Sequence, residues 1–412
     1  MENNHTPEIR FPGYIGDWEE RKIGEFLTES RISGTNGLEA KKLTVKLWGK
    51  GVVPKDEIYQ GSEATKYYIR KAGQFIYGKL DFLHQAFGII PDKLVGYEST
   101  VDSPAFDIAD NLNSSFFLEY VSRKQFYLYQ GTIANGSRKA KRIHSETFFE
   151  MPLIVPRMEE QIKIGNFFKQ LDDTIALHQQ ELDALKQTKQ GFLQKMFPKE
   201  GKSVPEVRFP GFTGDWEQRN LGDCISYIKG FAFKSEDYRS DGIRLVRVSD
   251  LSSNEIKFDN EKIFLDREYE NDYKKYKLNV GDIIITTVGS KVELKESAVG
   301  RPIIVNKENE GLLNQNLVKI SPLNGYNSYF IYKNLLQERY MNYIGSIERG
   351  NANQANIAIS DLWLYKVYLT SNEEQKQIGN FFKQLDDTIA LHHRELDALK
   401  ETKKAFLQKM FV

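Results

Sequence analysis

A long internal repeat constrains this chain more than any other feature. The segment PEIRFPGYIGDWEERKIG that begins at Pro7 returns as PEVRFPGFTGDWEQRNLG at Pro205, 198 residues later. A second pair is closer still, because the 39 residues from Glu159 and the 39 residues from Glu373 differ at only seven positions. The chain is thus an opening motif, a variable body and a long charged segment, followed by the same three again. Two long repeats exclude a solenoid of many short ones and predict a pseudo-two-fold molecule.

Both charged segments have the apolar spacing of a helix that packs along one face. The apolar residues step by alternating fours and threes, an a/d pattern that breaks only at His178 and Lys189 and at the matching His392 and Lys403. A helix of about 40 residues is about 60 Å long, so one compact domain cannot bury the whole stripe. We therefore predict an antiparallel pair within one molecule. The predicted packing residues are Ile164, Phe168, Leu171, Ile175, Leu182, Leu185 and Phe192 in the first helix, and Ile378, Phe382, Leu385, Ile389, Leu396, Leu399 and Phe406 in the second.

Other arrangements of these helices stay open at this point. They could be ordinary core helices, or they could form a coiled coil between molecules. The aligned histidines His178 and His392 resemble the start of a metal site, but two imidazoles without a third ligand are more typical of polar residues that set helix register. We therefore predict no metal site.

The two bodies predict an α+β fold with mixed or antiparallel sheets. Residues 72–79 and 280–287 each place a glycine turn before a β-rich run. Residues 114–130 and 326–344 predict one helix each, and the alternation over 362–367 predicts a strand. The predicted domains are a first body at 1–157, a helix at 158–198, a second body at 199–371 and a helix at 372–412.

Composition narrows the class of protein. A length of 412 residues suits two domains, and the single cysteine, Cys224, allows no internal disulfide. No run of about 18 apolar residues occurs, and the first residues lack the pattern of a signal peptide, so we expect a cytoplasmic protein. Lys and Arg total 57, as do Asp and Glu. A net charge of zero counts against strong nucleic-acid binding by this chain alone, but it allows local basic faces or a partner that supplies phosphate contacts.

The bodies differ most sharply just before each helix. Between Gly136 and Ile143 the chain reads SRKAKR, whereas between the matching Gly350 and Ile357 it reads NANQAN. Arg and Lys suit guanine edges and phosphates, and Asn and Gln suit adenine edges, so one frame with two polar sets is what the reading of two different short DNA sequences requires. A solvated polar loop is the alternative. The predicted DNA-contact residues are Tyr77, Lys79, His84, Gln85, Ser137, Arg138, Lys139, Lys141 and Arg142 in the first body, and Arg244, Arg247, Thr287, Ser290, Lys291, Gln315, Arg349, Asn351, Asn353, Gln354 and Asn356 in the second.

Motifs for catalysis are incomplete. An adenine methyltransferase needs an acid or amide followed by Pro-Pro-aromatic, but residues 103–106 read SPAF. Asp282 with Glu293 and Lys295 resembles a nuclease site, but the first body has Gln74 in place of the aspartate. No phosphate loop for ATP occurs. We therefore predict no catalytic residues and no cofactor bound by this chain.

The motifs together resemble the specificity subunits of type I restriction-modification enzymes. The resemblance rests on RFPG[YF]xGDWE, on EEQxxIGNFFKQLDDTIALH and on LNQNLVKI at residues 313–320, and it covers the whole chain. Residues 74–80 and 87–91 also look like one class of target-recognition domain. The resemblance implies double-stranded DNA as ligand, with one half of a split site bound by each body and the helices acting as a ruler. It also implies partners: two methyltransferase subunits with S-adenosylmethionine, and restriction subunits that use ATP and Mg²⁺. A coiled-coil adaptor that presents two protein-binding modules is the alternative from another class.

Overall fold

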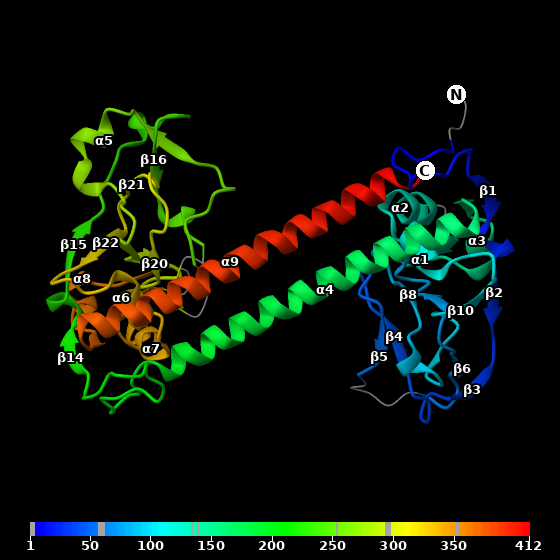
Figure 1. The fold of residues 1–412 in the computed structure, drawn as a ribbon, viewed down its shortest axis with the longest axis horizontal. Coiled ribbons are helices and arrows are strands. Elements are labelled where there is room, and N and C mark those ends of the chain that lie inside the picture. The colour runs from blue at the N-terminus through cyan, green and yellow to red at the C-terminus, as the bar shows by residue number, and fades with distance from the viewer. Residues whose placement is uncertain are drawn as a thin grey trace. The chain divides into compact units, whose positions relative to one another are not determined.

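The computed structural model of the chain describes residues 5–56, 62–132, 135–137, 140–252, 254–292, 298–351 and 354–412. The chain forms two compact units, one from Met1–Gln180 with Arg394–Val412 and the other from Glu181–His393. The boundaries fall inside the two long helices, α4 (Met158–Lys195) and α9 (Asn372–Lys409). Each unit therefore contains one body and a part of both helices (Figure 1).

The first unit is built around a four-stranded antiparallel sheet in the order β2-β10-β7-β8 (Figure 1). One of its two inner strands, β7 (Phe75–Tyr77), follows Gly73, which adopts φ +79 as the predicted turn requires. The strands of this unit are β1 (Glu19–Lys22), β2 (Leu27–Ser30), β3 (Ser33–Asn36), β4 (Leu43–Val45), β5 (Val52–Pro54), β6 (Lys66–Ile69), β7 (Phe75–Tyr77), β8 (Phe87–Ile89), β9 (Glu98–Ser99), β10 (Ala105–Ile108), β11 (Asn135–Ser137), β12 (Ala140–Arg142) and β13 (Pro152–Val155). Its core is rich in aromatic rings, because Phe75, Tyr77, Phe106 and Phe148 pack together.

The second unit repeats this topology. Its main sheet has the order β15-β22-β18-β20, again antiparallel throughout, and Gly281 at φ +91 precedes β18. The strands are β14 (Glu217–Asn220), β15 (Ile225–Lys229), β16 (Ile243–Val246), β17 (Ile263–Leu265), β18 (Ile283–Thr286), β19 (Val288–Gly289), β20 (Pro302–Ile304), β21 (Leu312–Leu313), β22 (Leu317–Pro322), β23 (Arg349–Asn351), β24 (Gln354–Asn356) and β25 (Lys366–Leu369). One pair, β16 with β21, is parallel. The predicted α+β class with mixed and antiparallel sheets is confirmed.

Two predictions about local structure need correction. Each segment predicted to hold one helix holds two, α1 (Ser114–Ser122) with α2 (Lys124–Thr132) and α6 (Ser328–Asn334) with α7 (Glu338–Ile347). Extended backbone at Arg123 and Gln337 interrupts the helices, and aromatic residues continue across the break because both helices face the core.

The strand predicted over 362–367 is also misplaced. Ile359–Leu362 forms the short helix α8, and β25 begins only at Lys366. Its counterpart in the first unit is α3 (Ser145–Phe149). A run of alternating apolar residues can belong to a buried helical turn or to a strand, so its period alone did not decide between them.

The repeated motifs are explained by how each body docks on its long helix. Arg10 of the opening motif donates through Nε and Nη2 to both oxygens of Glu160, over 2.7 and 2.8 Å. Arg208 does the same to Glu374, over 2.6 and 2.8 Å. Both glutamates lie in the first turn of a helix and are almost fully buried. The bidentate arginine offsets the desolvation cost of the buried carboxylate, and it fixes the opening motif to the helix.

The glutamines that follow these glutamates, Gln161 and Gln375, bind the N-termini of α1 and α6. Gln161 accepts a hydrogen bond from the Asn113 backbone N–H over 2.9 Å, and Gln375 accepts one from Asn327 over 3.3 Å. Asn113 and Asn327 are themselves the N-caps of α1 and α6. A methyl group added at Gly165 or at its equivalent Gly379 would overlap the Oδ1 atom of the capping asparagine. The glycine of the IGNFF motif therefore allows the cap of one helix to rest directly on another.

The two long helices pack antiparallel in each unit considered by itself. In the first unit Phe167 of α4 meets Phe406 of α9, with ring centroids 5.1 Å apart. In the second unit Phe192 of α4 meets Phe381 of α9 at the same separation of 5.1 Å. The early part of one helix thus contacts the late part of the other in both units. All the predicted packing residues are buried or half-buried.

Exchange of Gly165 for alanine tests the docking of α1. Helix propensity alone would add about 1 kcal/mol to the unfolding free energy, whereas the overlap with Asn113 should remove about 1–3 kcal/mol. We expect Gly165→Ala to lower the Tm of the full chain in thermal denaturation. Gly191→Ala in the same helix is the control, because an added Cβ there meets no atom within 4 Å, and it should raise stability slightly. A gain in stability for both variants would contradict the close approach.

Candidate nucleic-acid interface

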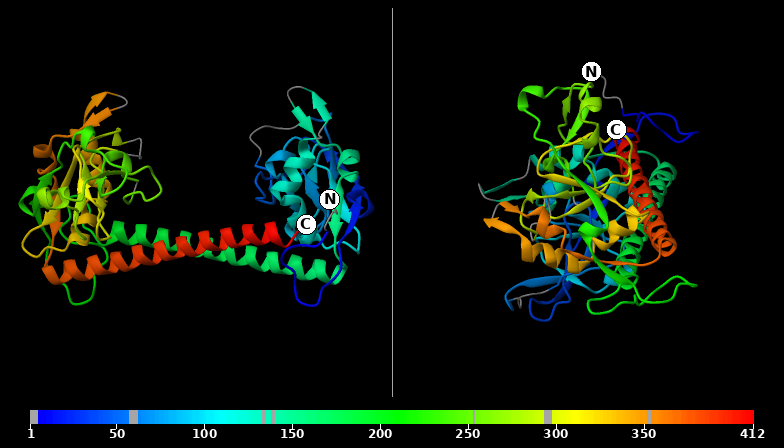
Figure 2. Two further views of the ribbon diagram at one scale, coloured as in Figure 1. Left: turned by 90° about the horizontal axis from the view of Figure 1, so that it is seen from above. Right: turned by 90° about the vertical axis from the view of Figure 1, so that its left-hand side faces the viewer.

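Each unit carries a β-hairpin where the two bodies differ most in sequence. β11 pairs with β12, and β23 pairs with β24, in the same register when the repeats are aligned. In each unit, considered by itself, the hairpin lies at the end of the body farthest from the long helices (Figure 2). Gly350 adopts φ +138, and a Cβ there would overlap the Gln354 carbonyl, so this turn of backbone requires glycine. The divergent polar segments are therefore displayed on the same framework.

The base of each hairpin is tied to the main sheet by equivalent backbone hydrogen bonds. The N–H of Ile143 donates to the carbonyl of Lys79 over 3.1 Å, and the N–H of Ile357 donates to the carbonyl of Thr287 over 3.0 Å. The Tyr77 hydroxyl also donates to the Ile143 carbonyl, over 2.9 Å. The two backbone bonds form whatever the side chains are, and the Tyr77 hydroxyl adds a side-chain bond in the first unit.

Three predicted contact residues have side chains that are almost fully buried. Tyr77 is 0% exposed, Thr287 is 5% and Arg244 is 8%. Burial raises the pKa of the Tyr77 hydroxyl far above its usual value. Arg244 donates to the Lys257 carbonyl over 2.6 Å, and its Nη1 lies 3.8 Å from Glu310 Oε2. Direct DNA contacts through the side chains of Tyr77 and Thr287 are corrected, because both pack inside the fold, whereas Arg244 lines a surface pocket with Lys262 and Lys307 and its contact stays a prediction.

The other candidates lie where a ligand can reach them or outside the described residues. Five are exposed: His84, Gln315, Arg349, Gln354 and Asn356. Six are half-buried: Lys79, Gln85, Arg142, Arg247, Ser290 and Lys291. Arg138, Lys139 and Asn353 lie outside the described residues, as do the side chains of Ser137, Lys141 and Asn351.

Some of the basic candidates are paired with carboxylates in the free protein. Arg142 Nη1 donates to Asp102 over 3.2 Å, and Arg349 Nη2 donates to Asp361 over 2.6 Å. Both arginines are solvent-exposed on at least part of the side chain, so each pair contributes little to stability and can open for a phosphate or a base. Arg247 is held more firmly, because two of its nitrogens each lie 3.0 Å from the carboxylate of the buried Asp250. That hydrogen bonding raises the pKa of the Arg247 guanidinium.

An exposed tryptophan in the first body was missed by the sequence analysis. Trp48 lies between β4 and β5, is 56% exposed and has φ +60, a conformation that a bulky residue rarely adopts. The backbone N–H of Trp48 donates to the His84 carbonyl over 2.7 Å, and the backbone N–H of Gly49 donates to the Gln85 carbonyl over 3.0 Å. The Trp48 and His84 ring centroids are 5.3 Å apart. The signal in the sequence is KLWGKG, an aromatic residue between lysines and glycines, and the candidates His84 and Gln85 form its support.

The acid considered for a nuclease has a structural role. Asp282 is 7% exposed and accepts hydrogen bonds from the Asn279 N–H over 2.9 Å and from Ser321 Oγ over 2.7 Å. Lys319 Nζ lies 3.3 Å from its second oxygen. These contacts brace the strands of the main sheet. Glu293 and Lys295, the other members of that motif, lie outside the described residues.

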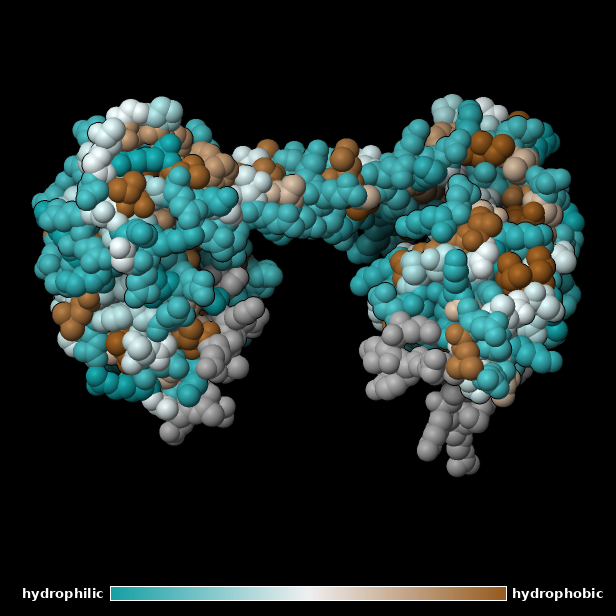
Figure 3. Space-filling view, turned by 90° about the horizontal axis from the view of Figure 1, so that it is seen from below, coloured by the Kyte–Doolittle hydropathy of each residue, from teal (hydrophilic) through white to brown (hydrophobic). Residues whose placement is uncertain are grey.

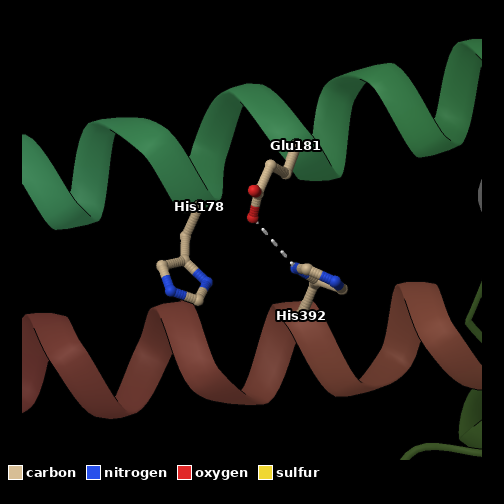
Figure 4. A group of neighbouring side chains, drawn as sticks. All are labelled: His178, Glu181 and His392. Atoms are coloured by element: carbon tan, nitrogen blue, oxygen red, sulfur yellow. Dashed lines mark ion pairs between the residues drawn. The ribbon is translucent and has the colours of Figure 1, made fainter.

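The histidines of the long helices face glutamates. In the second unit His392 Nδ1 lies 3.8 Å from Glu181 Oε2 (Figure 4), and in the first unit His178 Nδ1 lies 3.9 Å from Glu395 Oε2. The two pairs are the same pair of sequence positions with the helices exchanged. A polar contact that is met only in one alignment of the helices favours that alignment.

Hydrophilic residues dominate one face of each unit. The face shown in Figure 3 is largely hydrophilic, and its apolar residues lie in small separate groups. Among the described residues no helix is long and apolar enough to cross a membrane. The polar character suits side chains that make hydrogen bonds to a ligand over a wide area.

Comparisons with known proteins agree with this architecture. The family model for the type I restriction modification DNA specificity domain matches twice, at residues 15–187 and 213–401. The MjaVIII specificity subunit of Methanocaldococcus jannaschii is 23% identical over 298 residues, which cover 69% of this chain and 66% of that protein. The EcoBI specificity subunit of Escherichia coli is 26% identical over 230 residues, 52% of this chain and 46% of that protein. The chain thus spans less than two thirds of the length of these relatives.

A solved structure supports the same fold. The S subunit of a type I restriction-modification system from M. genitalium superposes with a TM-score of 0.64 at 14% identity, over 99% of both chains. The two family matches together cover most of the sequence and correspond to the two repeats. The chain therefore belongs to the type I restriction-modification specificity family and carries two copies of its DNA specificity domain.

Proposed function

We propose that this chain recognises a bipartite DNA target, one half with each body, and directs partner methyltransferase and restriction subunits to that target without catalysing a reaction itself. The observation that carries the proposal is the repeated hairpin: one backbone register, tied to the same sheet position in both units, presents different polar residues. Two half-sites of different sequence need two such surfaces, because base edges are distinguished by their donors and acceptors.

The charge of the chain fits a subunit that works with partners. Its net charge is zero, whereas a protein that holds DNA alone usually has a basic excess. The partner subunits would supply the remaining contacts and the cofactors, which are S-adenosylmethionine for methylation and ATP with Mg²⁺ for restriction. The long helices are the surface on which we expect two methyltransferase subunits to dock.

Methylation mapping of cells with and without this gene tests the proposal directly. We expect adenine methylation at a split sequence motif to disappear when the gene is deleted and to return when it is restored. A gel shift with random and target DNA, done with the methyltransferase partner present, is the control for direct binding. An unchanged methylome together with no DNA retention would favour the adaptor with two protein-binding modules.

The length of the paired helices is expected to set the unspecified spacer between the half-sites. Four residues inserted after Gln180 and four after His392 lengthen both helices at the same level, by about 6 Å. We expect the spacer to grow by about two base pairs, at about 3.4 Å per base pair, while both half-sites keep their sequence. Four residues inserted at the exposed Gly201, after the helix, should leave the spacer unchanged. Changed half-site bases in the methylome would reject the ruler.

Trp48 is a well-placed aromatic candidate for a DNA contact in the first body. Its exposed indole beside Lys46 and Lys50 resembles the aromatic and basic combination that binds nucleic acids. We expect Trp48→Ala to weaken retention of target DNA by about 2 kcal/mol, as for loss of an aromatic anchor from an interface, with the Tm of the full chain unchanged. Tyr14→Ala is the control, because Tyr14 packs on Lys163 of α4 and should not affect DNA binding. Equal retention by both variants would remove Trp48 from the interface.

A further inference from the structure

Each unit contains a group of three charged side chains where the body meets the two long helices. In the first unit Lys403 Nζ of α9 lies 2.7 Å from Asp172 of α4 and 3.0 Å from Glu119 Oε1 of α1. In the second unit Lys189 Nζ of α4 lies 2.6 Å from Asp386 of α9. Lys333 Nζ of α6 lies 2.6 Å from the other oxygen of Asp386.

The helices contribute the same two residues in both units. Asp386 corresponds to Asp172, and Lys403 corresponds to Lys189, at the offset that relates the helix beginning with Glu159 to the helix beginning with Glu373. Because the helices are antiparallel, each unit takes the aspartate from the helix that follows its own body and the lysine from the other helix. We name this aspartate and lysine together the helix couple.

The body residue that meets the helix couple has opposite charge in the two units. Glu119 and Lys333 occupy equivalent positions, five residues after the first residue of α1 and of α6 respectively, which begin at Ser114 and Ser328. Glu119 is 8% exposed and Lys333 is 0% exposed. The carboxylate pairs with the lysine of the couple, whereas the ammonium pairs with its aspartate. A buried charge without a partner would be strongly unfavourable in either case.

Each buried body residue is also close to the member of the couple that repels it. Burial and the negative charge of Asp172 raise the pKa of Glu119 to about 7, although Lys403 opposes the shift. Burial lowers the pKa of Lys333 to about 8, Asp386 opposes the shift, and Lys189 adds to it. Both members of the couple are therefore near enough to interact with whichever charge the body carries.

We propose that the helix couple is a docking surface that accepts a body with either a carboxylate or an ammonium at this position of its first helix, so that a body of either kind fits in either unit. An ordinary buried ion pair has one sign on each side, and reversing one member leaves two like charges together. The helix couple supplies both signs, and the reversed residue has only to turn from one member to the other.

Charge reversal of Glu119 in the full chain tests this surface. We expect Glu119→Lys to fold with a Tm within about 2 °C of the parent, because the new ammonium pairs with Asp172 as Lys333 pairs with Asp386. Hydrogen exchange of the α1 amides localises the effect to the first body, and the α6 amides serve as the internal control.

Removing one member of the couple at a time separates the two modes of pairing. In the parent, Lys403→Met should lower the Tm by about 5 °C or more because Glu119 loses its cation, whereas Asp172→Asn should be tolerated. In the Glu119→Lys background the order should reverse, with Asp172→Asn costly and Lys403→Met tolerated. Failure of Glu119→Lys to fold, or the same order of effects in both backgrounds, would overturn the proposal, and so would a parent that tolerates Lys403→Met.

Discussion

The pairing of α4 with α9 is the contact on which the rest of the structure depends. Each helix supplies residues to both units, and in each unit the body packs against the pair of helices. The seven positions at which the two helix segments differ are all exposed or half-buried, for example Ile162, Lys163 and Gln187 in the first copy. The buried identical positions contact the partner helix, the opening motif or the N-cap asparagine, and the two helices do this in the same way. This shared requirement explains the identity at those positions.

The two bodies have the same backbone topology, but their exposed side chains differ. Both main sheets have the same strand order, and both hairpins are anchored by the same backbone hydrogen bonds, yet the side chains around them are unrelated. Anchoring through backbone atoms explains how this is possible, since a carbonyl at position 79 or 287 accepts the same bond whether the residue is Lys or Thr. A scaffold of this kind keeps its geometry when the exposed residues vary.

The sequence predicted the architecture well because the architecture is carried by long, repeated patterns. The a/d stripe, the two repeats and the glycine turns before β7 and β18 are all visible in the amino-acid sequence. Short elements were harder: Leu362 belongs to a helical turn, and Arg123 breaks a segment whose apolar residues continue on both sides. Site residues were the least predictable, because exposure depends on contacts between distant segments. Tyr77 looked like a contact residue but its hydroxyl reaches Ile143, and Trp48 was overlooked because its support comes from His84 and Gln85.

The contribution of α9 to both units has a consequence for the order in which the protein folds during synthesis. The second unit is one continuous stretch, Glu181–His393, whereas the first unit also needs Arg394–Val412. Within the first unit Phe411 packs against Trp18 and Phe116, and Arg123 donates to the Val412 carbonyl over 2.8 Å. Domains usually fold in the order in which they leave the ribosome. Here the body that emerges first keeps the part of its aromatic core that Phe411 covers exposed until more than four hundred residues have been translated.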